Sequence, residues 1–417
     1  MANAKASIIT IGDELLIGQT IDTNSAWISQ RLNDFGMEVI RRVAVGDDAE
    51  AIRKAIDEEL PRVSVLLITG GLGPTADDIT KPLLTSYFGG SMVTDERVLE
   101  HVKGIFEKRK RPMLDVNLKQ AEVPDSCTVL FNRMGTAPGM LFEKEGRIVI
   151  AMPGVPYEMM AIMEDEVIPR LRMQFVSDAL VHRSIITVGE GESFLAERIK
   201  YLEAALPAHI KLAYLPSPNM VRLRLTGKGK DEIALVKEIE MRQEEIANRL
   251  EDIVVSLEDL PMEHIIGRLL LERKATVGLA ESCTGGNIAH LITQIMGSAH
   301  YFNGGIVCYQ NFVKEEVLGV KKETLEAHGA VSEETAIEMA KGALKVLKST
   351  YALGITGLLS PGGEDDRVPV GTIWIAVADK DDVRTCKFKL HYDRTRNKEV
   401  AVQMSLVAIW KFIHGKL

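Results

Sequence analysis

The chain of 417 residues is too long for one hydrophobic core, so two or three domains are expected. Hydrophobic residues make up 46% and charged residues 26%, a balance typical of a globular protein rather than a disordered one. Acidic side chains outnumber basic ones by 59 to 50, and the net charge of −9 argues against nucleic acid as a partner, because phosphate binding needs clustered Lys and Arg.

The cysteines and the first residues indicate the compartment. Cys127, Cys283, Cys308 and Cys386 form no CxxC or Cys/His metal spacing, which favours free thiols in a reducing environment. The start MANAKASIITIG has no charged leader followed by a long apolar stretch, and no apolar run reaches the 18 residues of a membrane span. We therefore expect a cytoplasmic protein without a membrane-spanning segment.

Short apolar runs alternate with amphipathic stretches in residues 1–172. Residues 7–11 (SIITI), 63–69 (VSVLLIT) and 147–152 (RIVIAM) are predicted strands, and the nearly all-apolar second run suits a parallel sheet covered on both faces. Helical spacing of apolar residues begins at Asn24. Strands that alternate with helices predict an α/β domain.

Residues 173–258 have a different pattern. Two strands (RSIITV and MVRLRLTG) and two charged helices near 194–206 and 231–250 predict a small α+β domain, and the segment LPSPN is expected to be a loop.

The α/β alternation resumes in residues 259–417. After the helix EHIIGRLLLERK come the strands TVGLA, GGIVCY, YALGIT and GTIWIAVA, with a helix over 332–347 and a last helix ending near Ile413. Ser332 directly precedes two glutamates, which favours a helix N-cap at this position. The whole chain is therefore predicted to be a multidomain α/β protein.

Ser282, Cys283 and Thr284 stand side by side in the segment AESCTGGN. A strand is predicted to end just before them, at Ala280, and a helix to begin near Gly286. Such an elbow exposes a side chain and aims free N–H groups at developing negative charge. From the residues alone two interpretations stay open: a nucleophile, or a helix cap beside a small buried cysteine.

Residues 263–417 closely resemble the C-terminal domain of CinA (competence/damage-inducible) proteins, through AESCTGG, GSAHYFNGGIVCYQNFVKEEVLGV, TLEAHGAVSEETA, ITGLLSPGG, PVGTIWIAVA and DRTRNKE in the family's order. The resemblance implies an amidohydrolase of pyridine-nucleotide (NAD) salvage. It would convert nicotinamide mononucleotide and water to nicotinate mononucleotide and ammonia, without a cofactor.

The same resemblance implies a serine–lysine pair, with Ser282 as the nucleophile, Lys314 as its base and Tyr309 orienting the lysine or sharing the proton. A lysine acts as a base only when it is neutral, which requires burial or a nearby cation. The predicted helix start around Lys314 also disfavours the ammonium ion. Apart from the resemblance, a lysine followed by two glutamates would be taken for a solvated surface residue.

Further residues carried over from the family are expected to contact the substrate. The oxyanion and substrate are assigned to Thr284, Gly285 and Gly286, the pocket to Thr356 and Gly357, and the 5′-phosphate to Arg394.

Cys283 is the competing nucleophile, with His290 or His328 as its base. The chain departs from the family in the loop 358–360, where Leu358, Leu359 and Ser360 replace small residues and are expected to narrow the pocket. Gln310 and Lys398 are two further departures, which bear on substrate affinity rather than on the chemistry.

The segment ITGGLGPTADDIT, residues 68–80, follows a predicted buried strand and precedes a predicted helix. Gly70, Gly71 and Gly73 can present N–H groups to a phosphate, and Thr75 can cap the helix. The segment is neither a Walker loop nor a GxGxxG motif.

Acidic residues occur in three separate loops of this domain: Asp13, Glu14, Asp77, Asp78 and Glu158. Carboxylates that converge on a pyrophosphate suit a hard divalent ion such as Mg²⁺, which bridges phosphate oxygens and activates water. Alternatively, Asp77 and Asp78 only complement the dipole of the helix that follows.

TIGDELLIGQTIDTN, TGGLGPTADDITK, NRMGTAPGM and MPGVPYEM resemble the molybdopterin-binding-like domain of CinA proteins. Members of the family hydrolyse ADP-ribose to AMP and ribose 5-phosphate with a divalent metal. The middle segment resembles the family's KH-type domain. However, an RNA-binding KH loop is basic, whereas residues 189–192 read GEGE, so a connector or dimer-forming element is expected instead.

We therefore expect a homodimeric, bifunctional hydrolase that binds nicotinamide mononucleotide and ADP-ribose and neither nucleic acid nor membrane. The rival hypothesis is a scaffold protein that binds a pterin or nucleotide with one or neither site active.

Overall fold

The computed structural model describes residues 4–75, 78–175, 179–361 and 368–417. The chain forms two compact units, one of Met1–Val181 with Gly227–Lys237 and one of His182–Thr226 with Glu238–Leu417. Within the described ranges, no helix combines the length and the apolar character needed to cross a bilayer.

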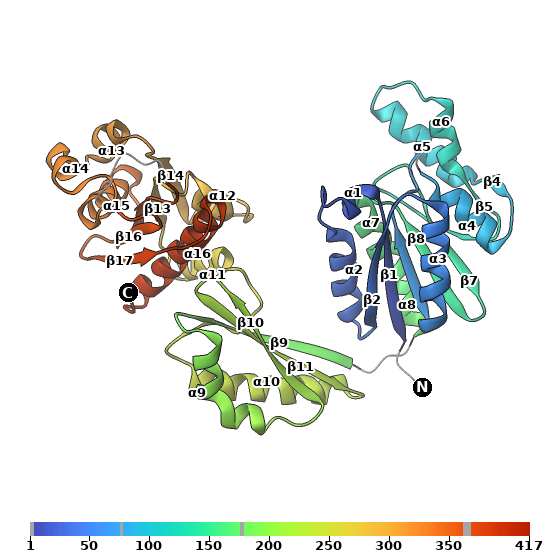
Figure 1. Ribbon diagram of the computed structural model, residues 1–417, viewed down its shortest axis with the longest axis horizontal. Coiled ribbons are helices and arrows are strands. Elements are labelled where there is room, and N and C mark those ends of the chain that lie inside the picture. Colours follow the sequence, from blue (N-terminus) through green and yellow to red (C-terminus); the bar gives the residue numbers. More distant parts are fainter. Residues whose placement is uncertain (1–3, 76–77, 176–178, 362–367) are drawn as a thin grey trace. The chain divides into compact units, whose positions relative to one another are not determined.

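A six-stranded sheet in the order β2-β1-β3-β8-β7-β6 forms the centre of the N-terminal domain (Figure 1). Four strands are parallel: β1 (Lys5–Ile11), β2 (Glu38–Val45), β3 (Val65–Thr69) and β8 (Arg147–Met152). Two more, β7 (Gly139–Lys144) and β6 (Thr128–Leu130), extend the sheet in the antiparallel sense. The expected parallel α/β sheet is present, with an antiparallel edge that the sequence analysis did not predict.

Helices cover both faces of this sheet, namely α2 (Thr23–Asn33), α3 (Ala49–Glu59), α4 (Thr80–Phe88), α7 (Pro156–Ile162) and α8 (Ile168–Gln174). The short helix α1 (Asp13–Leu16) directly follows β1 and buries no residue. Along β3, Leu67 packs on the α2 and α7 side, whereas Leu66 and Ile68 pack on the α3 and α4 side. The strand is apolar throughout because both of its faces are buried.

Between α4 and β6 the chain makes an excursion that contains a two-stranded sheet and two helices, namely β4 (Met92–Thr94), α5 (Glu96–Lys108), α6 (Asp115–Leu118) and β5 (Glu122–Pro124). Its small core is formed by Val98, Val102 and Ala121.

The middle segment contains a four-stranded sheet in the order β10-β11-β9-β12. Its elements are β9 (Ala179–Val188), α9 (Glu192–Ala204), β10 (Ile210–Ser217), β11 (Met220–Gly229), α10 (Glu232–Arg249) and β12 (Val254–Ser256). The prediction of two strands was therefore wrong, since β10 and β12 were missed. β10 is mostly half-exposed and ends in the proline-containing LPS segment that was expected to be a loop, and its turn into β11 uses Asn219 at φ 57°.

The C-terminal domain has a five-stranded sheet in the order β14-β13-β15-β16-β17. β13 (Val277–Glu281), β14 (Phe302–Val307) and β15 (Tyr351–Gly357) are parallel, and β16 (Thr372–Ala378) and β17 (Val383–Lys389) are antiparallel. Its helices are α11 (Met262–Glu272), α12 (Asn287–Thr293), α13 (Asn311–Leu318), α14 (Lys322–His328), α15 (Glu333–Leu347) and α16 (Arg394–Ile413). Ser332 caps α15 as predicted, because its Oγ accepts a hydrogen bond from the Thr335 N–H at 3.2 Å.

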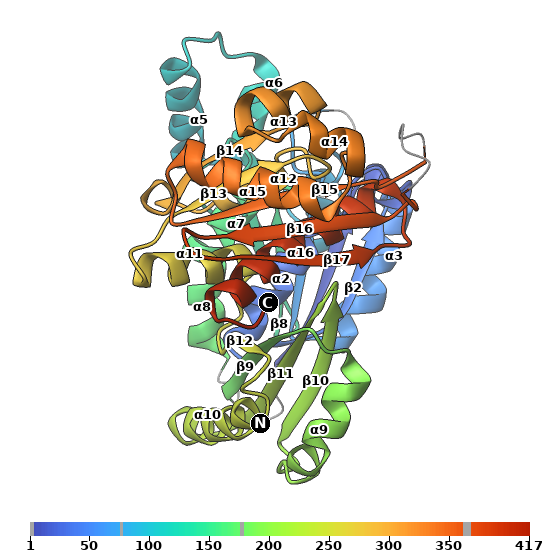
Figure 2. The ribbon, with the colours of Figure 1, turned by 90° about the vertical axis from the view of Figure 1, so that its left-hand side faces the viewer.

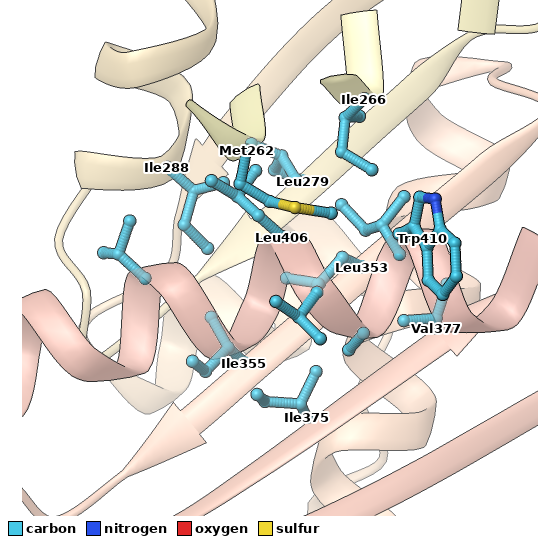
Figure 3. Packing of buried hydrophobic residues seen from close by; sticks show 14 of the residues in the cluster. Met262, Ile266, Leu279, Ile288, Leu353, Ile355, Ile375, Val377, Leu406 and Trp410 are labelled. Carbon is cyan, nitrogen blue, oxygen red and sulfur yellow. The ribbon is translucent and has the colours of Figure 1, made fainter. Parts of the chain in front are cut away.

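Two hydrophobic layers enclose this second sheet. On one face, Leu279 and Leu353 pack against Leu406 and Trp410 of α16, together with residues of α11 and α12 (Figure 3). On the opposite face lie α13, α14 and α15 (Figure 2). Side chains alternate along a strand, so Glu281, two residues after Leu279, points to the same face as the first layer.

Candidate functional site

The residues expected to carry out catalysis lie at the carboxyl ends of three parallel strands. Ser282 directly follows β13, Tyr309 lies two residues after the end of β14, and Thr356 is the second-to-last residue of β15. β13 lies between β14 and β15, so the chain passes from β13 to β14 on one side and from β14 to β15 on the other side, which reverses the strand order. Ligands of open α/β sheets bind at such a switch point, outside the carboxyl ends of the strands.

Ser282 is held by the main chain on both sides. Its N–H donates to the Ile355 carbonyl at 3.0 Å, and its carbonyl accepts from the Gly285 N–H at 3.1 Å. Gly285 and Gly286 have φ of 61° and 92°, left-handed values that favour glycine and close the turn tightly. The side chain is 8% exposed, and its hydroxyl makes no hydrogen bond to any described residue. The main chain of Ser282 is therefore held on both sides, and its hydroxyl is not used in a hydrogen bond within the described chain.

Lys314 is buried, with 1% of its surface exposed, which excludes the surface interpretation of this lysine. Its Nζ donates to the Cys308 carbonyl at 2.8 Å and to the Tyr309 carbonyl at 3.2 Å. Burial lowers the pKa of Lys314 from its usual 10.5, and the thiols of Cys308 and Cys283 oppose this in part. The direction of the shift favours the neutral amine that a base requires.

Cys308 joins the two halves of the proposed pair through its main chain. Its N–H donates to the Glu281 carbonyl at 2.9 Å, and its own carbonyl receives the Lys314 ammonium or amine. Across the described ranges, no hydrogen bond joins the Ser282 hydroxyl to Lys314 directly. Catalytic hydrogen bonds often tighten only when substrate is bound, so this geometry is compatible with a Ser–Lys pair.

Glu281 is a residue of the site that the sequence analysis missed. Its buried carboxylate accepts hydrogen bonds from the N–H groups of Gly286 (3.1 Å), Ile288 (3.1 Å) and Ala289 (2.9 Å). The Gly286 N–H donates to this carboxylate, and the Gly285 N–H donates to the Ser282 carbonyl. We expected both N–H groups to bind the oxyanion, but neither is free to do so. A charged residue ending an otherwise apolar strand was the available signal, since a buried carboxylate must be paired.

Thr284 follows Cys283 in the turn between β13 and α12. It is fully buried, its Oγ1 has no hydrogen-bond partner, and its N–H has no acceptor among the described residues. Of the N–H groups of Thr284, Gly285 and Gly286, the Thr284 N–H is thus the one without an acceptor in the described chain.

Arg394 connects two loops above the strand ends. Its Nη1 donates to Ser360 Oγ at 2.9 Å and its Nη2 donates to Tyr309 Oη at 3.0 Å. The Thr356 hydroxyl donates to the Ala330 carbonyl at 2.6 Å, so its proton is used within the fold. A Cβ added to Gly357 would lie 3.2 Å from Cys283 Sγ, so the end of β15 borders the Ser282 turn directly.

Two of the residues in the loop 358–360 that depart from the family have different surroundings in the structure. Leu359 is buried in the hydrophobic core and its carbonyl accepts from Asn397 Nδ2 at 2.9 Å, so it fills the core instead of narrowing the pocket as expected. Ser360 is the partner of Arg394.

Cys283 is poorly suited to be the nucleophile. Burial raises the pKa of its thiol to about 12, so the reactive thiolate is scarce. The two histidines considered as its base have other partners: His290 Nε2 lies 3.0 Å from Gln294 Nε2, and His328 Nδ1 lies 3.3 Å from Glu334 Oε1.

The N-terminal domain has a pocket of about 370 Å³ at the carboxyl ends of β1, β3 and β8. β1 lies between β2 and β3, so the pocket also occupies a switch point. Among the described residues that line it, the charged ones are all acidic: Glu14, Asp47, Asp78 and Glu158. An acidic pocket suits a cation, or an anionic ligand that brings one.

The glycine loop is closed by Asp78 instead of being open to a phosphate. The N–H groups of Gly73 and Thr75 each donate to its carboxylate at 2.8 Å, and the Thr75 hydroxyl also donates to it. The Gly70 N–H donates to the Met152 carbonyl, which leaves Gly71 as the expected phosphate donor without an acceptor in the described chain. Thr75 does not cap the helix, because α4 begins only at Thr80.

The expected metal ligands are not arranged as one cluster. Asp13 does not line the pocket and exchanges main-chain to side-chain hydrogen bonds with Asp47, at 3.0 and 3.1 Å. Asp77 lies outside the described residues. In the described ranges, no three His, Cys, Asp or Glu side chains are grouped to hold a metal ion. Glu14, Asp78 and Glu158 nevertheless line the same pocket.

Two further polar residues beside this pocket were missed. The buried side chain of Asn132 donates to Glu158 Oε2 at 2.7 Å and binds the N–H groups of Met134 and Gly135. Burial raises the pKa of Glu158, and this hydrogen bond opposes the shift. Lys81 is buried, donates to the carbonyls of Gln120 and Glu122, and has a pKa lowered to about 8 by its burial.

Known protein families match the chain in three consecutive parts. Residues 7–173 match the "Probable molybdopterin binding domain", residues 182–255 the "Damage-inducible protein CinA KH domain" and residues 259–413 the "CinA C-terminal domain".

Relatives extend over the whole chain. A CinA-like protein of Flavobacterium psychrophilum is 44% identical over 411 residues, 98% of each chain, and one of Cytophaga hutchinsonii is 42% identical over 412 residues, 99% of this chain and 98% of that protein. A crystal structure of a competence/damage inducible protein from Agrobacterium tumefaciens is 34% identical, covers 36% of this chain and 92% of that chain, and has a TM-score of 0.35. On this full-length similarity and the order of its three domains, the chain belongs to the CinA family of competence/damage-inducible proteins.

Proposed function

We propose that the C-terminal domain hydrolyses the amide of nicotinamide mononucleotide, with Ser282 as the nucleophile and Lys314 as the general base. The observation that carries the proposal is the burial of Lys314, whose amine lies against the Cys308 and Tyr309 carbonyls. A surface lysine would be protonated at neutral pH, whereas burial of the Lys314 amine lowers its pKa and so favours the neutral form.

The reaction then proceeds in two stages. The neutral Lys314 amine takes the Ser282 hydroxyl proton as Oγ bonds to the amide carbon, and it returns that proton to the leaving nitrogen, so that ammonia departs and an ester remains. In the second stage, water attacks the ester carbon and gives a proton to Lys314, the carbon–Oγ bond breaks, and Ser282 recovers its proton. The products are ammonia and nicotinate mononucleotide.

The neighbouring groups have distinct tasks in this proposal. The Thr284 N–H stabilises the oxyanion of each tetrahedral intermediate. Arg394 binds the 5′-phosphate through its planar fork, and exchanges its contacts with Ser360 and Tyr309 for phosphate oxygens when substrate binds. The Tyr309 hydroxyl is then free to share a proton with the lysine.

Ammonia release from nicotinamide mononucleotide tests this function. The wild-type chain is expected to release ammonia and nicotinate mononucleotide, and Ser282→Ala to lose this activity. Ser298→Ala, which removes a hydroxyl without a described partner in the same domain, is the matched control and should keep it. Nucleotide binding without ammonia release in the wild type would instead support the scaffold hypothesis.

We propose a second activity, the hydrolysis of ADP-ribose to AMP and ribose 5-phosphate, for the N-terminal pocket. Its location at a sheet switch point and its acidic lining support this proposal. Mg²⁺ is commonly held by one or two carboxylates plus substrate phosphates, so Glu14 and Glu158, which line this pocket, would hold it together with the substrate. When bound, such an ion would neutralise the pyrophosphate and lower the pKa of a water molecule.

ADP-ribose turnover with and without a chelator tests the second activity. We expect AMP formation that stops when the divalent ion is removed and that resumes when Mg²⁺ is added back. Turnover that is indifferent to the chelator would contradict the assignment of the acidic residues.

A homodimer in the cytoplasm is also proposed, and light scattering of the purified chain checks its oligomeric state.

A further inference from the structure

The Glu281 carboxylate lies at the centre of the turn that carries the proposed nucleophile. It is the last residue of β13, 1% of its surface is exposed, and its two oxygens accept three main-chain N–H groups at 2.9 to 3.1 Å. These N–H groups belong to Gly286, Ile288 and Ala289, at the start of α12. We call this arrangement the Glu281 cap.

The cap satisfies two unfavourable features with one side chain. A carboxylate without hydrogen bonds is costly to bury, and the first N–H groups of a helix have no partner within the helix. The three hydrogen bonds give the carboxylate its donors and the main-chain N–H groups their acceptor, so both costs are removed together. α12 has no side-chain cap from Gly286, the residue that directly precedes it, so Glu281 provides this function from five residues upstream.

The same residue is connected to the proposed base by its main chain. The Glu281 carbonyl accepts from the Cys308 N–H at 2.9 Å, and the Cys308 carbonyl accepts from Lys314 Nζ at 2.8 Å. Ser282 therefore lies between a side-chain attachment to α12 and a main-chain attachment to the lysine segment. Displacing the cap would move the hydroxyl relative to the amine.

We propose that Glu281 is a positioning residue for amide hydrolysis, which holds the Ser282 hydroxyl at its place between Lys314 and the substrate. This inference rests on the function proposed for the C-terminal domain. Glu281 occupies the N–H groups of Gly286, Ile288 and Ala289 at the helix start, so these donors are not available to the oxyanion. Glu281 itself touches neither substrate nor the reacting atoms.

The test compares Glu281→Gln with Glu316→Gln in the full-length chain. Glutamine keeps the shape of the side chain but replaces one acceptor oxygen by an NH₂ group that faces N–H donors. Glu316 is exposed on α13, two residues from Lys314, so the control makes the same chemical change near the site without a described partner. Ammonia release from nicotinamide mononucleotide gives kcat and KM, and hydrogen–deuterium exchange gives the protection of amides 286–289.

A misplacement of about 1 Å costs roughly 10²-fold in rate, so we expect kcat of Glu281→Gln to fall by about that factor while KM changes by less than about threefold. Exchange should accelerate in residues 286–289 and stay unchanged in β15 and β16. Glu316→Gln should match the wild type in both measurements. A purely structural cap would accelerate exchange but leave kcat intact, and that result would overturn the proposal.

A second variant covers the case in which Glu281→Gln does not fold. Glu281→Asp keeps the charge but shortens the side chain by one methylene, and it should lower kcat with an intermediate loss of amide protection. A wild-type kcat in this variant, despite accelerated exchange, would likewise overturn the proposal. If the wild-type chain released no ammonia, the proposed function would fail, and normal protection of amides 286–289 in Glu281→Gln would separately refute the cap.

Discussion

Replacing Ser282 and Cys283 separately by alanine distinguishes the two adjacent nucleophile candidates. Burial raises the pKa of Cys283 to about 12. This pKa lies about 4.5 above an assay pH of 7.5, so only about one Cys283 thiol in 3 × 10⁴ is a thiolate. The Ser282 hydroxyl makes no hydrogen bond in the described chain and follows the strand that ends at the switch point. The structure thus favours the serine.

We expect Ser282→Ala to lower kcat for ammonia release by about 10³-fold or more, since removal of a nucleophile leaves only binding and oxyanion stabilisation. Cys283→Ala should keep kcat within about threefold. Because Cys283 packs in the core and near Gly357, its truncation should cost roughly 1 kcal/mol of stability, which a urea titration measures.

Cys386→Ala is the matched control for this pair. Cys386 lies on β17, and burial likewise raises the pKa of its thiol, to about 11. Because Cys386 is only half-buried, its loss should cost no more stability than the loss of Cys283, and it should leave ammonia release unchanged. A Cys283→Ala protein that folds but loses about 10²-fold or more in kcat, beside a Ser282→Ala protein of normal activity, would refute the assignment of the serine.

Three other predictions follow from the described contacts. Lys81 has a pKa of about 8 in the folded chain, against an ordinary value of 10.5. Between these two pH values the folded chain binds fewer protons than the unfolded chain. The free energy of unfolding should therefore rise with pH by about 3 kcal/mol across this window. Lys81→Met should lack this rise, which is measured by urea titrations at pH 7 and pH 10 with pulsed hydrogen exchange in β3 as the readout. If the free energy of unfolding rose with pH equally in the variant and the wild type, the burial argument would be wrong. Arg394→Lys keeps the charge but loses the fork that reaches Ser360 and Tyr309, so KM for nicotinamide mononucleotide should rise roughly tenfold at nearly constant kcat, and an unchanged KM would remove the phosphate assignment. Ser332→Ala should destabilise the C-terminal domain by about 1 kcal/mol in thermal unfolding, because the Thr335 N–H loses its acceptor, whereas Ser298→Ala should have little effect.

Local patterns in the sequence predicted much of the architecture. β3 and β8 were recognisable as apolar runs, because both faces of a central parallel strand are buried, and α15 was recognisable from Ser332 and the acidic residues after it. These signals are contained in about ten consecutive residues. β10 and β12 were missed because they are partly exposed and lack a continuous apolar pattern.

The motifs provided candidate residues for the C-terminal site, but not their burial or their hydrogen-bond partners. Lys314 precedes two glutamates, as a surface lysine would, and only the packing of α13 encloses its amine against the Cys308 and Tyr309 carbonyls. Likewise, the glycines after Ser282 suggested an oxyanion site, but the carboxylate of Glu281 already occupies the Gly286 N–H.

The amino-acid sequence alone was sufficient to predict the order of domains, the central strands and the residues at their carboxyl ends, because periodicity and turn chemistry are local. Tertiary structure decided which N–H groups remain free, which carboxylates are tied up, as Asp78 is in the glycine loop, and which lysine loses its solvent. Burial and hydrogen-bond partners arise from segments tens of residues apart that the sheets bring together, and no short stretch of sequence contains that information.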